Sequence, residues 1–379
     1  MRIISSSVLL LNQPNTPLDA MRRIETCGRV CYKSEGKITP DSYQNFIERI
    51  VKRGHEAVLE HAALAVRLDS PKAVEWFNAL DLHSDFCGEK LYLKRTRGQS
   101  GTVVSGNFRA WRDALRLCIG GDVRVPHELV RILTAYDSVF SDLLGLVGVA
   151  DDGHVTPVVP SELKADYEIR AHTFRTFRFI CDRGVSHELV RHRPASFCQE
   201  STRYCNYARE DFGKEITVIL PRCFGADTVM YGTFIEAAVT AERLYFELLD
   251  KGATAQEARA VLPNCLKTEL VMTAPIEEWL HVFRLRCSEA AHPQMREMAT
   301  RAKELHQNQK PVELIERCIE KHSAEGDVVF DGFMGSGTTA VAAYRLNRRF
   351  IGFEIEPKYF WMIHNRLCEE VQHGQHGTG

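Results

Sequence analysis

Residues 191–204, Arg191-His-Arg-Pro-Ala-Ser-Phe-Cys-Gln-Glu-Ser-Thr-Arg-Tyr204, hold the densest chemical signal of the chain. Three potential cations in a row, followed by Arg203, would repel one another inside a fold unless an anion lies among them. The planar fork of arginine suits phosphate, and the ring of Tyr204 can stack on a planar ligand. A solvated basic loop is the alternative interpretation, but apolar residues flank the stretch, among them Leu189 before it and Tyr207 after it. The stretch therefore predicts an anion-binding site.

The composition is that of a soluble globular protein, and the length suggests about two to three domains. The 379 residues include 44% hydrophobic and 26% charged residues, which excludes wholesale disorder. A net charge of −2 excludes a protein that coats nucleic acid in bulk, so any phosphate site must be local. No apolar run reaches the ~20 residues that a membrane span requires, and we expect no signal peptide.

The twelve cysteines do not follow a metal-binding pattern. No CxxC pair occurs, and the closest pair, Cys27 and Cys31, has no second pair at zinc spacing. We therefore expect no metal site. Most of the thiols are expected to be reduced core residues of a cytoplasmic protein.

The periodicity of residues 1–300 predicts a mixed α+β fold. Apolar residues at helical spacing predict helices over about 40–53 and 231–251, and Thr254-Ala-Gln-Glu257 is a capping box that begins a short helix. Residues 172–181 alternate aromatic and polar side chains, which indicates a strand. Residues 151–161, with a glycine and prolines, indicate a loop.

Beyond about residue 301 the pattern changes to that of a parallel α/β unit. A helix over 311–321, a strand over 327–333, a tight Gly335-Ser-Gly337 turn, a helix over 338–346 and a strand over 350–355 follow one another. This order predicts a right-handed crossover, as in part of a Rossmann-like sheet. We place the domain boundary near residue 305, with one domain over 1–304, a smaller unit over 305–371 and a disordered tail over 372–379.

Five blocks of the sequence, in the same order, resemble the flavin-dependent thymidylate synthases. Arg191-His192-Arg193, then seven residues and Ser201, matches the RHR-x7-S signature of that family, and an Arg-Tyr pair follows at 203–204. Upstream, Gly54-His55-Glu56 with Glu60-His61 resembles the GHE-x3-EH element. Three downstream segments of this chain also resemble family segments, namely Ala258-Arg259-Ala-Val-Leu-Pro263, Phe283-Arg-Leu-Arg286 and Ala291-His-Pro-Gln-Met-Arg296. One tripeptide would be weak evidence, but five ordered blocks are specific.

The resemblance implies a reductive methylation of dUMP to dTMP. In that family methylene-tetrahydrofolate gives the carbon, reduced FAD gives the hydride and NADPH reduces the flavin again. The family also implies a homotetramer with sites shared between subunits. We therefore expect dUMP and folate as substrates, FAD and NADPH as cofactors, and neither DNA nor a membrane as a partner.

The resemblance also implies roles for matching residues. Arg286 would be the catalytic residue, because a fixed guanidinium facing the uracil stabilises its ionised N3 form and activates C5. Ser201 would position dUMP rather than attack it, since no acidic partner completes a triad with His192. The residues expected to bind dUMP are Arg191, Gln199, Ser201, Arg203, Arg259 and Arg286, and those expected to bind FAD are His55, Arg191, His192, Arg193, Gln199 and His281.

Ordinary structural roles are the alternatives for single residues. His55 and His61 are also consistent with hydrogen-bonded core histidines, and Arg286 with one half of a structural ion pair. The sequence departs from the family at Pro275 and His281, where asparagine is common, and at Glu188, where glutamine is common. Pro275 has no backbone N–H, so the flavin contacts there must differ. An insertion over about residues 68–165 is a further departure, expected to be a helical elaboration.

The C-terminal unit resembles the cofactor-binding part of amino-group DNA methyltransferases, which carry a DPFxGSGTT motif. Here the stretch is Asp331-Gly-Phe-Met-Gly-Ser-Gly-Thr-Thr339, and Asp331, Gly335, Gly337 and Glu354 are expected to bind S-adenosylmethionine. Glu354 follows the glycine-rich stretch at about the sequence distance at which an acidic residue binds the ribose hydroxyls in such folds. However, the chain lacks the Pro-Pro motif that positions the base amine in those enzymes. Residues 301–379 hold ten basic and eleven acidic residues, which is no footprint for DNA.

Three functions therefore remain open. The leading hypothesis is a flavin-dependent thymidylate synthase with an appended methyltransferase-like remnant. The second is a DNA amino-methyltransferase that depends on S-adenosylmethionine. The third is a nucleotide-binding regulator without enzymatic activity.

Overall fold

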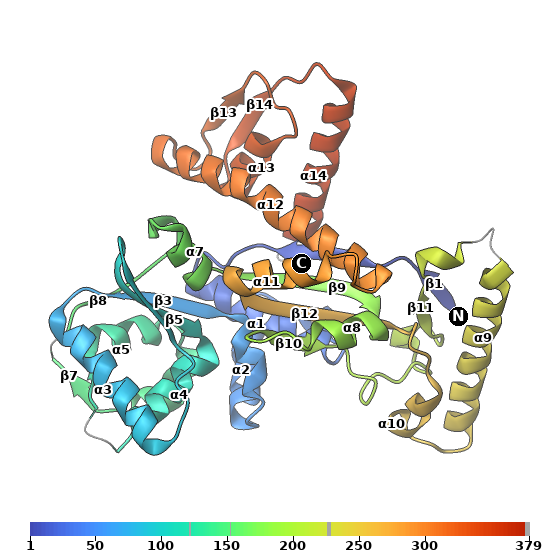
Figure 1. Ribbon diagram of the computed structural model, residues 1–379, viewed down its shortest axis with the longest axis horizontal. Helices are drawn as coiled ribbons and strands as arrows, with labels where there is room; N and C mark the ends of the chain where they lie inside the picture. The colour runs from blue at the N-terminus through green and yellow to red at the C-terminus, as the bar shows by residue number, and fades with distance from the viewer. Residues whose placement is uncertain (121–122, 152, 226–228, 376–379) are drawn as a thin grey trace. The chain divides into compact units, whose positions relative to one another are not determined.

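A four-stranded antiparallel sheet includes one strand from the basic cluster of residues 191–204. The computed structural model describes residues 1–120, 123–151, 153–225 and 229–375. The strand order is β10 (Ser196–Gln199), β12 (Lys267–Pro275), β9 (Phe174–Asp182) and β2 (Ser7–Leu11) (Figure 1). Residues 268–275 of β12 are buried, as in a strand packed on both of its faces. The expected strand over 172–181 is thus confirmed as β9, shifted by one or two residues.

Two helices extend from the central strands toward each other. The strand pair is aligned from Lys267 opposite Asp182 to Pro275 opposite Phe174. Helix α8 (Arg183–Leu189) follows β9, and helix α11 (Ile276–Arg286) follows β12, so the helices begin at opposite ends of the pair. Asp182 caps α8 by accepting a hydrogen bond from the backbone N–H of Val185 at 2.7 Å.

Trp279 fixes α11 on the sheet. Its side chain is fully buried, and its ring lies 4.5 Å from that of Phe177 in an edge-to-face arrangement. The indole Nε1 donates a hydrogen bond to the backbone oxygen of Arg175 at 3.0 Å. Because both contacts are made to β9, the helix is held to the neighbour of its own strand.

Other helices and short strands complete this part of the chain. Helix α2 confirms the expected helix over 40–53, helix α9 confirms that over 231–251, and Thr254 and Glu257 form the expected capping box of α10. None of the described helices is both long and apolar enough to span a bilayer. The elements are β1 (Arg2–Ile4), paired in parallel with β11 (Thr217–Ile219), and the helices α1 (Pro17–Val30), α2 (Ser42–Lys52), α7 (Asp166–His172), α9 (Val229–Asp250) and α10 (Ala255–Ala258).

The region between His61 and the basic cluster of residues 191–204 contains a sheet as well as helices. Its strands follow the order β4 (Lys94–Gly98), β5 (Gly101–Asn107), β3 (Ala63–Leu68) and β8 (Val155–Pro157). The helices are α3 (Pro71–Cys87), α4 (Phe108–Cys118), α5 (His127–Thr134) and α6 (Asp137–Leu144), and β6 (Val125–Pro126) pairs with β7 (Val149–Ala150). The helical elaboration expected here has its helices, but it also contains strands that were not expected.

The loop expected over 151–161 was also wrong in part, because β8 lies within it. β8 is an edge strand that pairs only with β3, and an edge strand tolerates proline because one side of its backbone needs no ladder partner. Pro157 therefore ends a strand at a place where the sequence alone indicated a turn.

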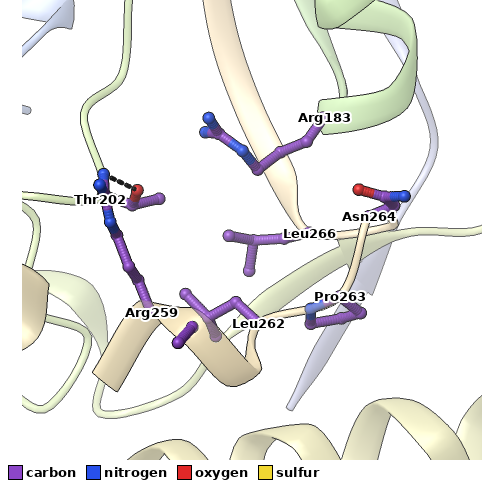
Figure 2. A pocket seen from close by; sticks show the side chains of 8 residues that line it. Arg183, Thr202, Arg259, Leu262, Pro263, Asn264 and Leu266 are labelled. Carbon is purple, nitrogen blue, oxygen red and sulfur yellow. Dashed lines mark hydrogen bonds between the residues drawn. The ribbon is translucent and has the colours of Figure 1, made fainter. Parts of the chain in front are cut away.

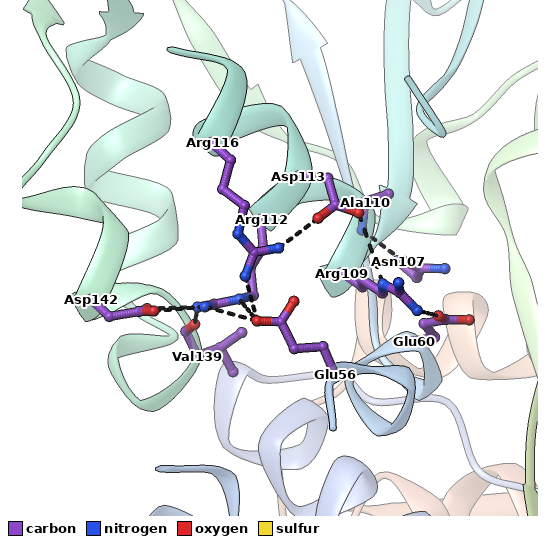
Figure 3. A network of polar contacts seen from close by, with 10 residues as sticks. All are labelled: Glu56, Glu60, Asn107, Arg109, Ala110, Arg112, Asp113, Arg116, Val139 and Asp142. Carbon is purple, nitrogen blue, oxygen red and sulfur yellow. Dashed lines mark hydrogen bonds and ion pairs between the residues drawn. The ribbon is translucent and has the colours of Figure 1, made fainter. Parts of the chain in front are cut away.

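Charged side chains join α4 to the 3-10 turn over Glu56–His61, which contains the GHE-x3-EH element except for Gly54 and His55 (Figure 3). Glu56 binds both Arg112, with an N···O distance of 3.2 Å, and Arg116. Arg112 is only 1% exposed and also binds Asp142 at 2.6 Å. Burial by itself would raise the pKa of Glu56, but the bonds and charges of the two arginines outweigh it and hold the pKa below its usual value.

The chain divides into two units, the second of which contains residues 301–379 together with residues 39–41. Helix α12 (Pro293–His322) continues through the division at residue 300, so the expected boundary near 305 falls inside a helix. In the second unit β13 (Val328–Asp331) pairs in parallel with β14 (Arg349–Gly352), and α13 (Thr338–Arg345) connects them. Ile319, Val341 and Ala343 are among its buried core residues.

The tail expected over residues 372–379 overlaps a helix at residues 372–375. Helix α14 (Pro357–Gln375) continues through them, because each residue added to an existing helix needs to gain only one further hydrogen bond. Residues 376–379 lie outside the described residues.

Glu56→Gln should destabilise the fold. The substitution removes the charge that Arg112 and Arg116 share, and we expect a loss of about 2 kcal/mol in the free energy of unfolding at pH 7. Because the folded-state pKa of Glu56 is lowered, its contribution is complete above pH 4.5 and is lost as the pH falls through the folded pKa. Urea unfolding at pH 7 and at pH 3.5 would measure both effects.

Asp113→Asn is the matched control, since Asp113 pairs with the same Arg116 but is 41% exposed. A loss below about 1 kcal/mol is expected there. Equal losses in the free energy of unfolding for the two variants would contradict a stabilising role of the buried ion pairs of Glu56.

Candidate active site

Arg286 lies where the C-terminal ends of α8 and α11 meet. Its Nε donates to Nε2 of His192 at 3.0 Å, its Nη1 to a carboxylate oxygen of Glu188 at 2.8 Å, and its Nη2 to the backbone oxygen of Glu188 at 3.1 Å. A guanidinium carries five N–H groups, so these bonds fix its orientation and leave donors for a ligand. Arg286 therefore forms the ion pair considered as its structural alternative, without losing the capacity to bind.

His192 is a neutral imidazole at physiological pH. Burial, the charge of Arg286 and the neighbouring His281 lower its pKa to about 4. Because Arg286 can only donate, Nε2 of His192 must accept, which places the proton of the neutral ring on Nδ1. Of the three potential cations at residues 191–193, the central one is therefore uncharged.

Glu278 faces the protonated side of His192. One of its carboxylate oxygens, Oε1, lies 3.5 Å from Nδ1 of His192, and the residue is only 6% exposed. Burial and the nearby charge of Glu277 raise the pKa of Glu278 to about 7. Among the described residues Oε1 has no hydrogen-bond partner. The motifs gave no indication of this residue.

His192, Glu278 and His281 also offer nitrogen and oxygen atoms within 4.8 Å of one another, a spacing compatible with a metal ion. Their hydrogen bonds favour a different role. Nε2 of His192 accepts from Arg286, and Nδ1 of His281 accepts from Arg284 at 2.8 Å. A metal on Nδ1 of His192 would displace its proton and, with it, the tautomer that accepts from Arg286. We therefore interpret the trio as a hydrogen-bonded group.

The other residues expected to bind FAD have different surroundings. Arg191, Arg193 and His55 are exposed. Arg193 donates to the backbone oxygens of Val190 and His192, at 2.7 and 2.8 Å. No hydrogen bond or ion pair between described residues joins His55 to the His192 group. His61 has the core role considered for it, since it is buried and its Nδ1 lies 2.7 Å from the hydroxyl of Thr273.

Both departures near α11 have a structural role. Pro275 occupies the position before the helix, where the missing N–H of a proline breaks no intrahelical bond. Glu188, which stands where glutamine is common in the family, is the partner of Arg286. Its negative charge is thereby compensated by a cation instead of facing a phosphate.

A second group of polar residues lines a cavity of about 310 Å³ (Figure 2). Arg259 donates to the hydroxyl of Thr202 at 3.3 Å, and Arg183 extends into the same cavity from the first turn of α8. The Nη1 atom of Arg183 is buried and has no hydrogen-bond partner among the described residues. Asn264 also lines the cavity, and no acidic residue does. Two guanidinium groups without a carboxylate form a site for an anion.

The remaining dUMP-binding candidates lie along the chain that leads to this cavity. Gln199 ends β10, and its Nε2 already donates to the hydroxyls of Ser186 and Thr268, at 2.9 and 3.1 Å. The Ser201 hydroxyl accepts from the backbone N–H of Arg203 at 3.3 Å. Arg203 is exposed and lies over the ring of Tyr204, 5.5 Å from its centroid.

The candidates thus form two groups in one chain. Hydrogen bonds and ion pairs join Arg286 to His192 and Glu188, and Arg259 to Thr202, and none runs between the two groups among the described residues. The motifs missed Glu278 and Arg183. Arg183 directly follows the cap of α8, and a cation beside an acidic N-cap is unremarkable in a sequence, so no local signal distinguishes it.

The glycine turn of the second unit brings together the four residues expected to bind S-adenosylmethionine. Gly335 and Gly337 have left-handed backbone conformations, with φ of 51° and 81°. The backbone N–H of Gly335 donates to the Glu354 carboxylate at 2.7 Å, and the backbone oxygen of Asp331 accepts from Phe353 at 3.1 Å. Glu354 therefore binds the turn itself, where a ligand would need the same N–H group.

Comparison with known proteins identifies similarity over both parts of the chain. A family model described as "Thymidylate synthase complementing protein" matches residues 15–76 and 164–312, which is more than half of the chain. A second model, described as "DNA methylase", matches residues 263–365. The first match leaves out residues 77–163, within the region of the second sheet.

Curated relatives named "Flavin-dependent thymidylate synthase" are similar over shorter stretches. The protein from Pyrococcus abyssi is 34% identical over 155 residues, which are 38% of this chain and 63% of the relative. The protein from Pyrococcus furiosus is 35% identical over 127 residues, or 33% of this chain and 51% of the relative. That from Geobacter sulfurreducens is 36% identical over 117 residues, or 31% and 49%. The chain thus spans about half to two thirds of these relatives.

Inorganic phosphate should stabilise the protein through the cavity of Arg183 and Arg259. Ligand that binds only the folded state raises the melting temperature with concentration. Arg183→Met should weaken this effect about ten-fold or more, the value of one hydrogen bond to a charged group. Thermal unfolding in phosphate, at constant ionic strength, measures it. Arg243→Met removes an exposed arginine of α9 and should change nothing; an equal loss in both variants would refute the anion site.

Proposed function

The chain belongs to the thymidylate synthase complementing protein family, and from this premise we propose that it converts dUMP to dTMP by reductive methylation. The observation that carries the proposal is the fixed guanidinium of Arg286, which His192 and Glu188 hold with donors to spare. A guanidinium that is already oriented stabilises negative charge on a pyrimidine without reorganisation when the reaction occurs. Arg286 is the proposed catalytic residue.

FAD fits the surroundings of His192. The donors and acceptors there are a neutral buried imidazole, a second imidazole on His281 and a carboxyl group with a raised pKa, which suit a polar but uncharged ring system. When bound, FAD supplies the hydride, while methylene-tetrahydrofolate is the carbon donor and NADPH the reductant. His192 and His281 would contact the flavin, joined by the exposed His55, Arg191 and Arg193.

The dUMP phosphate is proposed to bind between Arg183 and Arg259. Ser201 and Arg203 lie in the adjacent segment, and Gln199 continues it into β10. Arg286 would face the uracil, and Arg191 would lie near the nucleotide. One nucleotide that contacts both groups of residues would be bound most simply if each group came from a different subunit.

A homotetramer with shared sites accounts for that division. Helix α9 supports an oligomer, because it has few buried residues and exposes apolar side chains, with Val229, Met230 and Val239 at 96%, 52% and 46% exposure. We place the enzyme in the cytoplasm, in agreement with twelve free cysteines in the structure.

We also propose how the chain is divided into domains. Residues 1–304 would form the synthase, with residues of about 68–165 inserted, and residues 305–371 a methyltransferase-like fragment with part of a Rossmann-like sheet. The alternative function, methylation of DNA amino groups with S-adenosylmethionine, is favoured by the match to the DNA methylase model and by the glycine turn. It is opposed by the missing Pro-Pro motif and by the bond of Glu354 to Gly335.

The synthase activity can be tested with the purified full-length protein. We expect a yellow flavin spectrum that bleaches with NADPH and dUMP, and formation of dTMP when methylene-tetrahydrofolate is added. Arg286→Ala should lower kcat by about 10² to 10³, the value of one preorganised donor, while dUMP still binds. Retained binding with lost turnover would also exclude a non-enzymatic regulator. A colourless protein that FAD cannot reconstitute, and that forms no dTMP, would contradict the proposal.

The second unit should not transfer methyl groups to DNA. Incubation of the protein with DNA and S-adenosylmethionine labelled in the methyl group should leave the DNA unlabelled, because the sequence lacks the Pro-Pro motif that positions the base amine in amino-group DNA methyltransferases. Labelled adenine or cytosine would overturn this expectation and establish the alternative function.

A further inference from the structure

Glu278 is a buried acid that no motif singles out and that has no role so far beyond the surroundings proposed for FAD. Its side chain is only 7% exposed, and Oε1 faces Nδ1 of His192 at 3.5 Å without a hydrogen-bond partner among the described residues. An unpaired carboxylate oxygen in this position is costly, since burial removes its water. Such a group persists where its charge has a specific effect on a neighbour.

The neighbour is one link in a line of four residues. Glu188 accepts from Arg286, Arg286 donates to Nε2 of His192, and Nδ1 of His192 faces Glu278. Each link constrains the next, because a guanidinium has no acceptor and a neutral imidazole has one donor and one acceptor nitrogen. Arg286 is held at its Nε only while the proton of His192 is on Nδ1.

We propose that Glu278 is a positioning residue, which keeps the proton of His192 on Nδ1 and thereby holds Arg286 in its working orientation. This inference rests on the proposed function only for its effect on catalysis. The link between Glu278 and the tautomer of His192 is a property of the chain alone.

The protonation state of Glu278 determines which tautomer of His192 is favoured. Burial raises the pKa of Glu278 to about 7, and burial lowers that of His192 to about 4, so His192 is neutral throughout the range in which Glu278 titrates. Above pH 7 the carboxylate can only accept, which favours the proton on Nδ1. Below pH 7 the carboxylic acid can donate to Nδ1 instead, which places the proton of His192 on Nε2, against the N–H of Arg286.

Other charged groups near Glu278 do not replace it. Glu277 precedes it on α11 but binds Lys94 at 3.0 Å, and His281 accepts from Arg284. The elements packed against α11 include α7, β9 and β12, of which β12 carries Lys267 and Glu269, an ion pair with an N···O distance of 3.4 Å. Their ionisable residues include Glu168 and His172, whose side chains bind serine and threonine hydroxyls of β4, β5 and the turn between them, and also Asp166, Arg170, Arg175, Arg178 and Asp182. None of these described groups is paired with Nδ1 of His192, whereas Glu278 lies 3.5 Å from it.

The tautomer can be observed directly on the full-length protein without substrate. In histidine labelled with 15N, the shifts of Nδ1 and Nε2 distinguish the two neutral tautomers, and His192→Gln identifies the signals. We expect the Nδ1–H form above pH 7 and a change toward Nε2–H as the pH falls through about 7. Glu278→Gln should remove this change, because its amide does not titrate. The same change in Glu278→Gln as in the wild type would overturn the inference.

The effect on catalysis has its own readout. kcat for dTMP formation should fall about ten-fold as the pH is lowered through 7, the value of one hydrogen bond to a charged group. This fall in kcat at low pH should be absent in Glu278→Gln. It should remain in the control Glu277→Gln, at a slightly lower pH, because the negative charge that raises the pKa of Glu278 has been removed. A fall in kcat that persists unchanged in Glu278→Gln would contradict the inference. If no variant forms dTMP but the tautomer changes with Glu278, the proposed function fails and the positioning role stands.

Discussion

The contact between Arg286 and the end of α8 depends on matched lengths of secondary structure. The strand pair β9–β12 is nine residues long, about 30 Å at 3.4 Å per residue. Helices α8 and α11, with seven and eleven residues, span about 10 and 16 Å. Since they start at opposite ends of the pair and run toward each other, these lengths just allow their ends to meet. One added residue in α11 would rotate Arg286 by about 100° and separate it from both partners.

This geometry also explains how a basic stretch is accommodated inside a fold. Two helix C-termini with negative partial charge meet at Arg286, so its positive charge is favourable there, and Glu188 compensates the rest. His192 is neutral, while Arg191 and Arg193 are exposed to water. The structure therefore needs no anion among residues 191–193, and the described site where two guanidinium groups meet without a carboxylate is the cavity of Arg183 and Arg259.

Sequence patterns predicted the elements better than the contacts between them. The helices α2 and α9, the strand β9 and the capping box at Thr254 were predictable because periodicity and capping are local properties. The pairing of Glu188 with Arg286 and the position of Glu278 beside His192 were not, since they follow from the register of β9 against β12. β8 was missed for a related reason: its strand character comes from pairing with β3, whereas its own residues signal a turn.

The inserted region is physically coupled to the family's own motif. Residues 77–163 lie outside the family match, yet α4 within them supplies Arg112 and Arg116 to Glu56, and Arg109 to Glu60 at 2.9 Å. Arg112 and Arg116 thus compensate the buried charge of Glu56, and loss of one partner from such a pair is strongly destabilising. Glu60 also accepts from Ser196, the first residue of β10, at 2.8 Å. The insertion therefore stabilises the strand that lies between Arg193 and Ser201 of the signature, and it cannot be treated as an independent addition to the synthase.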